Sequence, residues 1–114
     1  MNTKSSREHD PQVCGTWLGR AFEFLGKRWN AVILAALGEG PAGFADLRRS
    51  VGAITDSVLS DRLSELAGVG LIERTVADTR PPTVRYELTP AGLALLPVLD
   101  QLAGWAAGNL DGPR

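Results

Sequence analysis

The chain has 114 residues, of which 44% are hydrophobic and 22% are charged, and its formal net charge is -1. This length suits one compact domain, and the near-neutral charge argues against broad, nonspecific binding of nucleic acid, although it leaves room for a local basic patch. The single cysteine excludes an intrachain disulfide, and no apolar stretch approaches the roughly 20 residues that a membrane helix needs. Because the polar N-terminus lacks the apolar core of a signal peptide, we predict a cytoplasmic protein without a membrane partner.

The first part of the chain predicts a polar arm and four helices. Residues 1–11 are polar and mixed in charge, and we expect them to be a disordered arm. Apolar residues recur at helical spacing over 14–25. The stretch 29–37, "WNAVILAAL", is apolar almost all round, which predicts a central buried helix. A short amphipathic helix over 44–50 and a longer one over 55–67 follow.

The second part predicts a β-hairpin and a final helix. Two β-rich runs, "LIERTVA" and "TVRYEL", flank "DTRPP", whose two prolines stiffen the tip of a hairpin. Thr89 is a suitable N-cap for the last helix, Pro90 suits its first position, and Pro97 is expected to kink it. We expect the last four residues, 111–114, to fray.

This order of elements predicts one domain over residues 12–110 with an α+β, mainly α, architecture. Three helices followed by a hairpin form a winged helix-turn-helix. The helices at 44–50 and 55–67 are its helix-turn-helix pair, and residues 78–83 are the tip of its wing.

The helix at 55–67 has two distinct faces. The side expected to pack on the core carries Leu59, Leu63, Leu66 and Ala67. The opposite side carries small polar residues at helical spacing, namely Ser57, Ser60, Asp61 and Ser64. A helix with so little bulk on its outer face can enter the DNA major groove, where hydroxyls bond to phosphates or base edges. An ordinary solvated helix is the alternative, and the adjacent hairpin favours DNA recognition.

Other residues are expected to complete the DNA contact. Arg62 lies at the boundary of the two faces, where it could reach a phosphate or pair with Glu65. A carboxylate at Asp56 suits the helix N-terminus, whereas Asp61 needs a cytosine amino group or an arginine beside it. Basic residues elsewhere must supply positive charge, and the candidates are Lys27, Arg28, Arg48, Arg49, Arg80 and Arg85. The predicted DNA-binding set is Arg48, Arg49, Thr55, Asp56, Ser57, Ser60, Asp61, Arg62, Ser64, Arg80 and Arg85.

An enzyme is the first competing interpretation, and the sequence argues against it. The chain has one histidine, no cluster of metal ligands, and no phosphate-binding loop, because "GEGPAG" lacks the lysine of a P-loop. We therefore expect no catalytic residues, metal or cofactor. The second competing interpretation is a winged helix that contacts another protein, which the net charge of -1 would suit.

Three stretches of the chain carry a family resemblance. They are "FLGKRWNAVILAAL", "GFADLRRSVGAITDSVLSDRLSELAGVGLIERTV" and "PPTVRYELTPAGLALLPVLDQLAGW", which together span most of residues 14–105. In these stretches the chain resembles the HxlR-type transcriptional regulators, relatives of the MarR group. The resemblance implies a homodimer that binds double-stranded operator DNA. It also implies that the first and last helices form the dimer interface.

Apolar residues at both ends of the chain agree with such an interface. The predicted interface residues are Trp17, Phe22, Leu25, Leu99, Leu102 and Trp105. The alternative is that these side chains complete the core of the monomer.

Cys14 also fits the resemblance, since family members often have a cysteine just before the first helix. In some members it senses oxidants or electrophiles such as quinones. A helix N-terminus lowers a thiol pKa, which favours the reactive thiolate. Two departures stand out, because Gly15 follows the cysteine where the family usually has proline, and Ser64 replaces a common arginine. The alternatives are that Cys14 is a packing residue, or that a non-covalent small-molecule effector controls the protein.

Overall fold

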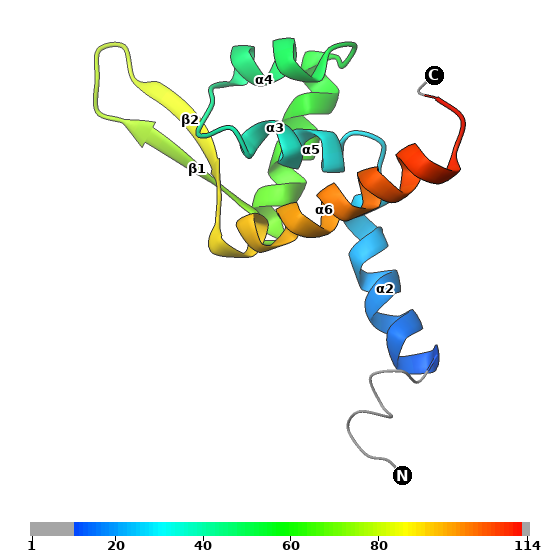
Figure 1. The fold of residues 1–114 in the computed structure, drawn as a ribbon. Coiled ribbons are helices and arrows are strands. Elements are labelled where there is room, and N and C mark those ends of the chain that lie inside the picture. The colour runs from blue at the N-terminus through cyan, green and yellow to red at the C-terminus, as the bar shows by residue number, and fades with distance from the viewer. Residues whose placement is uncertain (1–10, 113–114) are drawn as a thin grey trace.

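The computed structural model of the protein describes the backbone of residues 11–112 and the side chains of residues 15–112. Its elements follow the predicted order, and one hairpin projects from the side of a helical body (Figure 1). The helices are α2 (Pro11–Leu25), α3 (Asn30–Leu37), α4 (Phe44–Val51), α5 (Asp56–Gly68) and α6 (Pro90–Asn109), and the strands are β1 (Ile72–Ala77) and β2 (Thr83–Leu88). The winged helix-turn-helix prediction is therefore confirmed. The expected arm at 1–10 lies outside the described residues, whereas residue 11 begins α2.

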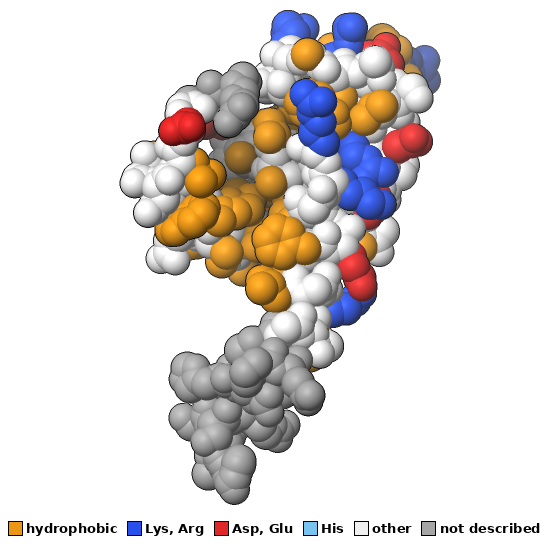
Figure 2. Space-filling view, turned by 90° about the vertical axis from the view of Figure 1, so that its right-hand side faces the viewer, with side chains coloured by type: hydrophobic (Ala, Val, Ile, Leu, Met, Phe, Trp, Pro, Cys, Tyr) orange, Lys and Arg blue, Asp and Glu red, His pale blue; other side chains and the backbone are white. Residues whose placement is uncertain are grey.

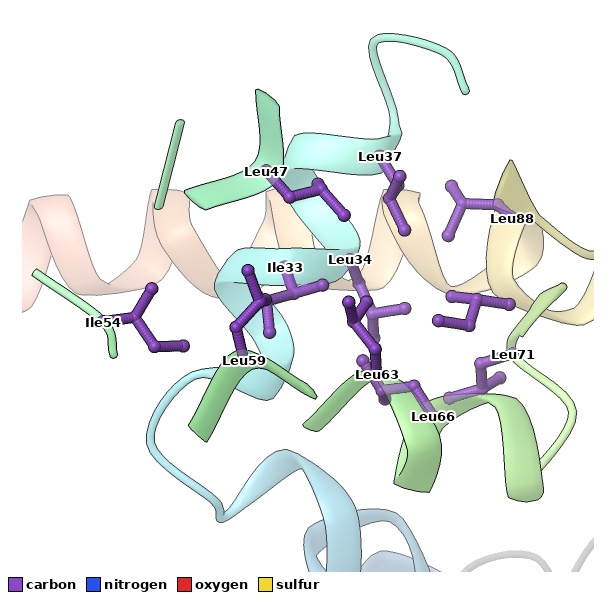
Figure 3. Close-up of a cluster of buried hydrophobic side chains, with 11 residues drawn as sticks. Ile33, Leu34, Leu37, Leu47, Ile54, Leu59, Leu63, Leu66, Leu71 and Leu88 are labelled. Carbon is purple, nitrogen blue, oxygen red and sulfur yellow. The ribbon is translucent and has the colours of Figure 1, made fainter. Parts of the chain in front are cut away.

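The hydrophobic core surrounds α3, as its apolar sequence predicts. Figure 3 shows the leucines of α5 facing α3 across this core. The buried cluster consists of Ile33, Leu34, Leu37, Leu47, Ile54, Leu59, Leu63, Leu66, Leu71, Ile72 and Leu88. One predicted core residue is wrong, because Ala67 is exposed. The cluster reaches only to Leu66 along α5, and the helix ends at Gly68, one residue after Ala67.

The hairpin pairs with a further segment that the sequence analysis did not connect to it. β1 and β2 pair antiparallel, with Ile72 opposite Leu88 and Ala77 opposite Thr83. Ala42, in the loop before α4, adds a bridge to Tyr86 of β2, with N···O distances of 2.9 and 2.8 Å. This bridge fixes the start of the helix-turn-helix pair against the wing.

Hydrogen bonds and a close backbone approach join the segment after α5 to the start of α6. The Thr89 hydroxyl donates to the Gly70 carbonyl at 2.6 Å and accepts from the Gly92 amide at 3.2 Å, which confirms Thr89 as a cap. Gly70 has φ of +82°, a conformation that favours glycine. A Cβ on Gly92 would clash with the Leu71 carbonyl, so α6 approaches this turn as closely as only glycine allows. The helix then continues without interruption through Pro97.

The two terminal helices give the molecule its elongated form. α2 extends away from the body (Figure 1), and the principal extents are 61 × 34 × 22 Å. Within the described part of the chain, no helix has the length and apolar character to cross a membrane.

Candidate DNA-binding surface

The outer face of α5 is narrow and polar. Ser57, Ser60, Asp61 and Ser64 are all exposed, and they lie opposite the leucines that α5 buries. Thr55 caps the helix, because its hydroxyl accepts from the Val58 amide at 3.2 Å. The two faces predicted from the helical spacing are thus present, apart from the exposed alanine at position 67.

The two helices of the helix-turn-helix pair are joined by an ion pair. Arg48 Nε of α4 lies 2.7 Å from Asp56 Oδ1 in the first turn of α5, and both side chains are more than half exposed. Arg49 pairs with Asp46 within α4. Both arginines expected to attract phosphate therefore have a carboxylate partner in the free protein. Exposed pairs of this kind contribute little to stability, so a phosphate can compete for these arginines.

Arg62 pairs with Glu65 rather than pointing into solvent. The Arg62 side chain is only 18% exposed, and its guanidinium donates to Glu65 Oε1. Of the two roles open to Arg62, the structure thus has the intrahelical pair. Lys27 Nζ also contacts Glu65, at 3.2 Å from Oε2, and Arg28 stacks on the Trp29 ring at 4.7 Å from its centroid.

The wing carries arginines without carboxylate partners. Arg80 at the tip and Arg85 on β2 are exposed, and neither forms an ion pair within residues 15–112. The Thr79 hydroxyl donates to the Pro81 carbonyl at 2.8 Å, which braces the tip. Sequence reasoning missed Arg74, an exposed residue of β1 that lies opposite Tyr86 and hence on the other face of the hairpin from Arg85.

A second surface, formed by α2 and α6, is apolar. Figure 2 shows hydrophobic side chains gathered between the two ends of the chain, with Lys and Arg side chains along the opposite edge of the view. Four of the six predicted interface residues are exposed, namely Trp17 (69%), Phe22 (48%), Leu102 (47%) and Trp105 (55%). The other two, Leu25 and Leu99, are half-buried against the core. The terminal helices therefore leave large apolar side chains uncovered within one chain.

Cys14 falls in the first turn of α2, but its side chain lies outside the described residues. Sequence reasoning also missed Asn30, which is fully buried at the start of α3. Its Nδ2 donates to the Phe24 carbonyl at 2.8 Å and to Glu65 Oε1 at 3.5 Å. A lone polar residue at the start of an apolar run was the available signal.

Several transcriptional regulators are similar to this chain in sequence and in fold. The family model described as HxlR-like helix-turn-helix matches residues 24–113. The HTH-type transcriptional regulator YodB of Bacillus subtilis is 38% identical over 86 residues, which cover 75% of this chain and 77% of YodB. The solved structure of reduced YodB has a TM-score of 0.77 and 32% identity, covering 92% of this chain and 98% of that one. The quinone-bound structure of YodB has a TM-score of 0.71 and 35% identity, and the match covers 80% of this chain and 94% of that one.

The match to the family model spans the helix-turn-helix pair, the wing and α6, and the matches to YodB agree with it in sequence and in fold. This chain therefore belongs to the HxlR-like helix-turn-helix family of transcriptional regulators.

Proposed function

We propose that this protein is a homodimeric, sequence-specific DNA-binding regulator that reads the major groove with α5 and contacts the adjacent backbone with its wing. The observation that carries the proposal is the exposed row of serines on α5, opposite its buried leucines. The major groove is roughly 12 Å wide, and a helix with short polar side chains enters it without steric conflict. Serine hydroxyls then bond to base edges or phosphates.

The charge for this contact comes from the wing and from α4. Arg80 and Arg85 are exposed and have no carboxylate partner among the described residues, so they are available to phosphates. Arg48 and Arg49 become available when phosphates displace Asp56 and Asp46. Arg62 has a positioning role in this proposal, because it is largely buried against Glu65.

The apolar surface of α2 and α6 supports a symmetric homodimer. Four large side chains that would otherwise face water are covered when two copies meet there. Two-fold symmetry then presents two copies of α5 to successive major grooves, about 34 Å apart. A palindromic operator follows from this arrangement.

Cys14 gives the proposed regulator a route to chemical control. It is the only thiol of the chain and lies in the first turn of α2, beside the proposed dimer seam. The solved structure of quinone-bound YodB supports a quinone as the class of electrophile. Alkylation or capping of Cys14 would change the packing of α2 against the partner and thereby the spacing of the two α5 helices.

Selection of bound duplexes from a random pool tests DNA recognition directly. We expect enrichment of a two-fold symmetric site, with half-sites one helical turn apart, and tighter binding of that site than of a scrambled duplex in fluorescence anisotropy. A pool that stays unenriched would contradict the proposal.

The control by Cys14 is tested by measuring operator affinity before and after treatment with diamide or a quinone. We expect the wild type to lose affinity and Cys14→Ser to keep it. If mass spectrometry shows the wild-type thiol to be modified while operator affinity is unchanged, Cys14 is not a sensor.

A further inference from the structure

The centre of the exposed face of α5 is a carboxylate rather than a hydroxyl. Successive residues of a helix are turned by about 100° around its axis, so Asp61 lies almost directly opposite the buried leucines of α5. Asp61 is exposed, with Ser57 and Ser64 beside it on one side of the face and Val58 on the other. A helix that enters the major groove with this face therefore brings Asp61 to the base edges.

Asp61 has no basic partner within residues 15–112. Its neighbour Arg62 pairs with Glu65, and Arg48 pairs with Asp56 in the first turn of the helix. Of the two partners that the sequence leaves open for Asp61, an arginine is thus absent from the described part of the chain. In a complex with DNA, the carboxylate must find its hydrogen-bond donor in the groove.

The chemistry of the base edges restricts which donor that is. An ionised carboxylate only accepts hydrogen bonds. In the major groove, guanine presents two acceptors, N7 and O6, and thymine presents the O4 acceptor. Adenine has an amino group, but its N7 acceptor lies beside it and repels a carboxylate. Cytosine presents the N4 amino group, which is the group that aspartate accepts from in the major groove.

Val58 adds a second, apolar contact to the same face. It is 37% exposed and is the one large apolar side chain that α5, which is described in full, leaves exposed. It precedes Asp61 by three residues, a rise of about 4.5 Å along the helix, close to the roughly 3.4 Å between successive base pairs. The C5-methyl group of thymine is the apolar group of the major groove. The two side chains therefore suit neighbouring base pairs.

We propose that Asp61 selects a cytosine and Val58 a thymine on a neighbouring base pair, so that each operator half-site contains both bases. This inference rests on the proposed function and names the bases that α5 reads. Asp61 acts as much by exclusion as by attraction, because its charge is repelled by phosphates and by acceptor atoms wherever the cytosine is missing.

Selection from a random pool with the wild type and with Asp61→Ala tests the cytosine contact. We expect one fixed cytosine in each half-site of the wild type, and a loss of preference at that position alone in the variant. Replacing that C·G pair by T·A should weaken binding of the wild type about tenfold and that of Asp61→Ala little. Asp61→Ala should also bind a scrambled duplex more tightly. Identical base preferences of the two proteins would overturn the proposal.

Glu39→Ala is the matched control for the loss of one negative charge. Glu39 is an exposed carboxylate in the loop after α3, and it also lacks an ion pair within residues 15–112. This change should leave the preference at every position of the site as it is in the wild type. If Asp61→Ala raises the affinity for all duplexes by one common factor, Asp61 acts only as a repulsive charge, and the cytosine contact is overturned.

Substitution of uracil for each thymine of the selected half-site tests the contact of Val58, because it removes only the methyl group. For one thymine beside the cytosine position, we expect the wild type to lose about threefold in affinity. Val58→Ala should bind the thymine and uracil duplexes equally. The same loss in both proteins, or no loss in the wild type, would overturn the role of Val58.

The results also separate this inference from the proposed function. A pool that the wild type leaves unenriched would overturn both. A two-fold symmetric site that is enriched but has no cytosine preference dependent on Asp61 would overturn the inference and leave the proposed function standing.

Discussion

At the scale of single residues, Glu65 joins α5 to the segment that follows α2, a role that its position on an amphipathic helix does not indicate. It meets Lys27, Asn30 and Arg62, and it is the carboxylate whose pKa is lowered by those contacts despite its burial. The exposed serines of α5, Ser57, Ser60 and Ser64, have no such side-chain contacts among the described residues and are available to a partner. One helix thus carries an ion-paired end and a face of small, exposed polar side chains.

We predict that Glu65→Gln destabilises the protein in a pH-dependent way. Because the folded-state pKa is lowered, the stabilisation is fully present above the unfolded pKa of about 4.3 and is lost as pH falls through the lower folded value. Urea denaturation at pH 7 should give a loss of about 1 kcal/mol, and the difference from wild type should shrink below pH 4.

Glu23→Gln is the matched control for this pH dependence, because within residues 15–112 the only ion pair of Glu23 is the exposed one with Arg20. It should change stability little at either pH. A difference between wild type and Glu65→Gln that is as large at pH 3 as at pH 7 would contradict the role given to the carboxylate.

A second prediction at this scale separates charge from sequence readout. Arg80→Ala should weaken binding to all duplexes alike and reduce the slope of log Kd against log salt by roughly one unit, because one phosphate contact is lost. Ser60→Ala should alter base preference more than salt dependence. Anisotropy titrations over a range of salt concentrations distinguish the two, and identical, purely electrostatic effects would argue against the assignment.

At the scale of elements, the junction of α5, β1 and α6 determines where the wing lies. The Thr89 hydroxyl caps α6 and also reaches back to the Gly70 carbonyl, so one side chain joins two elements. Gly92 lets the first turn of α6 approach the Leu71 carbonyl. Thr89 and Gly92 therefore fix the start of α6 against the segment that joins α5 to β1.

We predict that Gly92→Ala destabilises the protein by about 2 kcal/mol, because the added methyl group overlaps backbone that cannot move aside. Gly104→Ala in the same helix is the control. A Cβ at Gly104 has no atom within 4 Å outside its own helix, so this change should stabilise by about 0.5 kcal/mol or more. Thermal denaturation followed by circular dichroism measures both, and similar effects from the two changes would contradict the close approach at Gly92.

At the scale of the whole molecule, the two terminal helices leave an apolar surface that one chain does not cover. Large side chains of α2 and α6, including both Trp17 and Trp105, are more than half exposed. Self-association through this surface is the simplest way to remove them from water, and it would also set the distance between two α5 helices.

We predict a dimer in sedimentation velocity at micromolar concentration, and a monomer for Leu102→Glu, because a buried glutamate at the seam would be an unpaired charge. Val76→Glu places the same charge on an exposed apolar residue of the wing and should remain dimeric. A wild-type monomer, or a Leu102→Glu variant that stays dimeric, would contradict this interface.

Much of the fold follows from local sequence signals. Examples are the N-caps Thr55 and Thr89, the end of α5 at Gly68 and the apolar run of α3. Each of these signals acts within a few residues, so it can be interpreted without knowing the rest of the chain. The two faces of α5 follow from the helical period for the same reason. Ala67 shows the limit, because its burial depended on how far the core extends along the helix.

Contacts between distant residues were decided only by the tertiary structure. Arg48 could not be matched to Asp56 from spacing alone, because the two meet across the turn between α4 and α5. Ala42 could not be matched to Tyr86 either, because the loop before α4 and strand β2 are far apart in the sequence. The sequence by itself determined which residues form helices and strands and which face of α5 is polar, because those are short-range properties of the chain. The joining of Glu65 to the turn after α2 and the extent of the exposed apolar surface depend on how the elements pack, and packing couples residues that no local pattern connects.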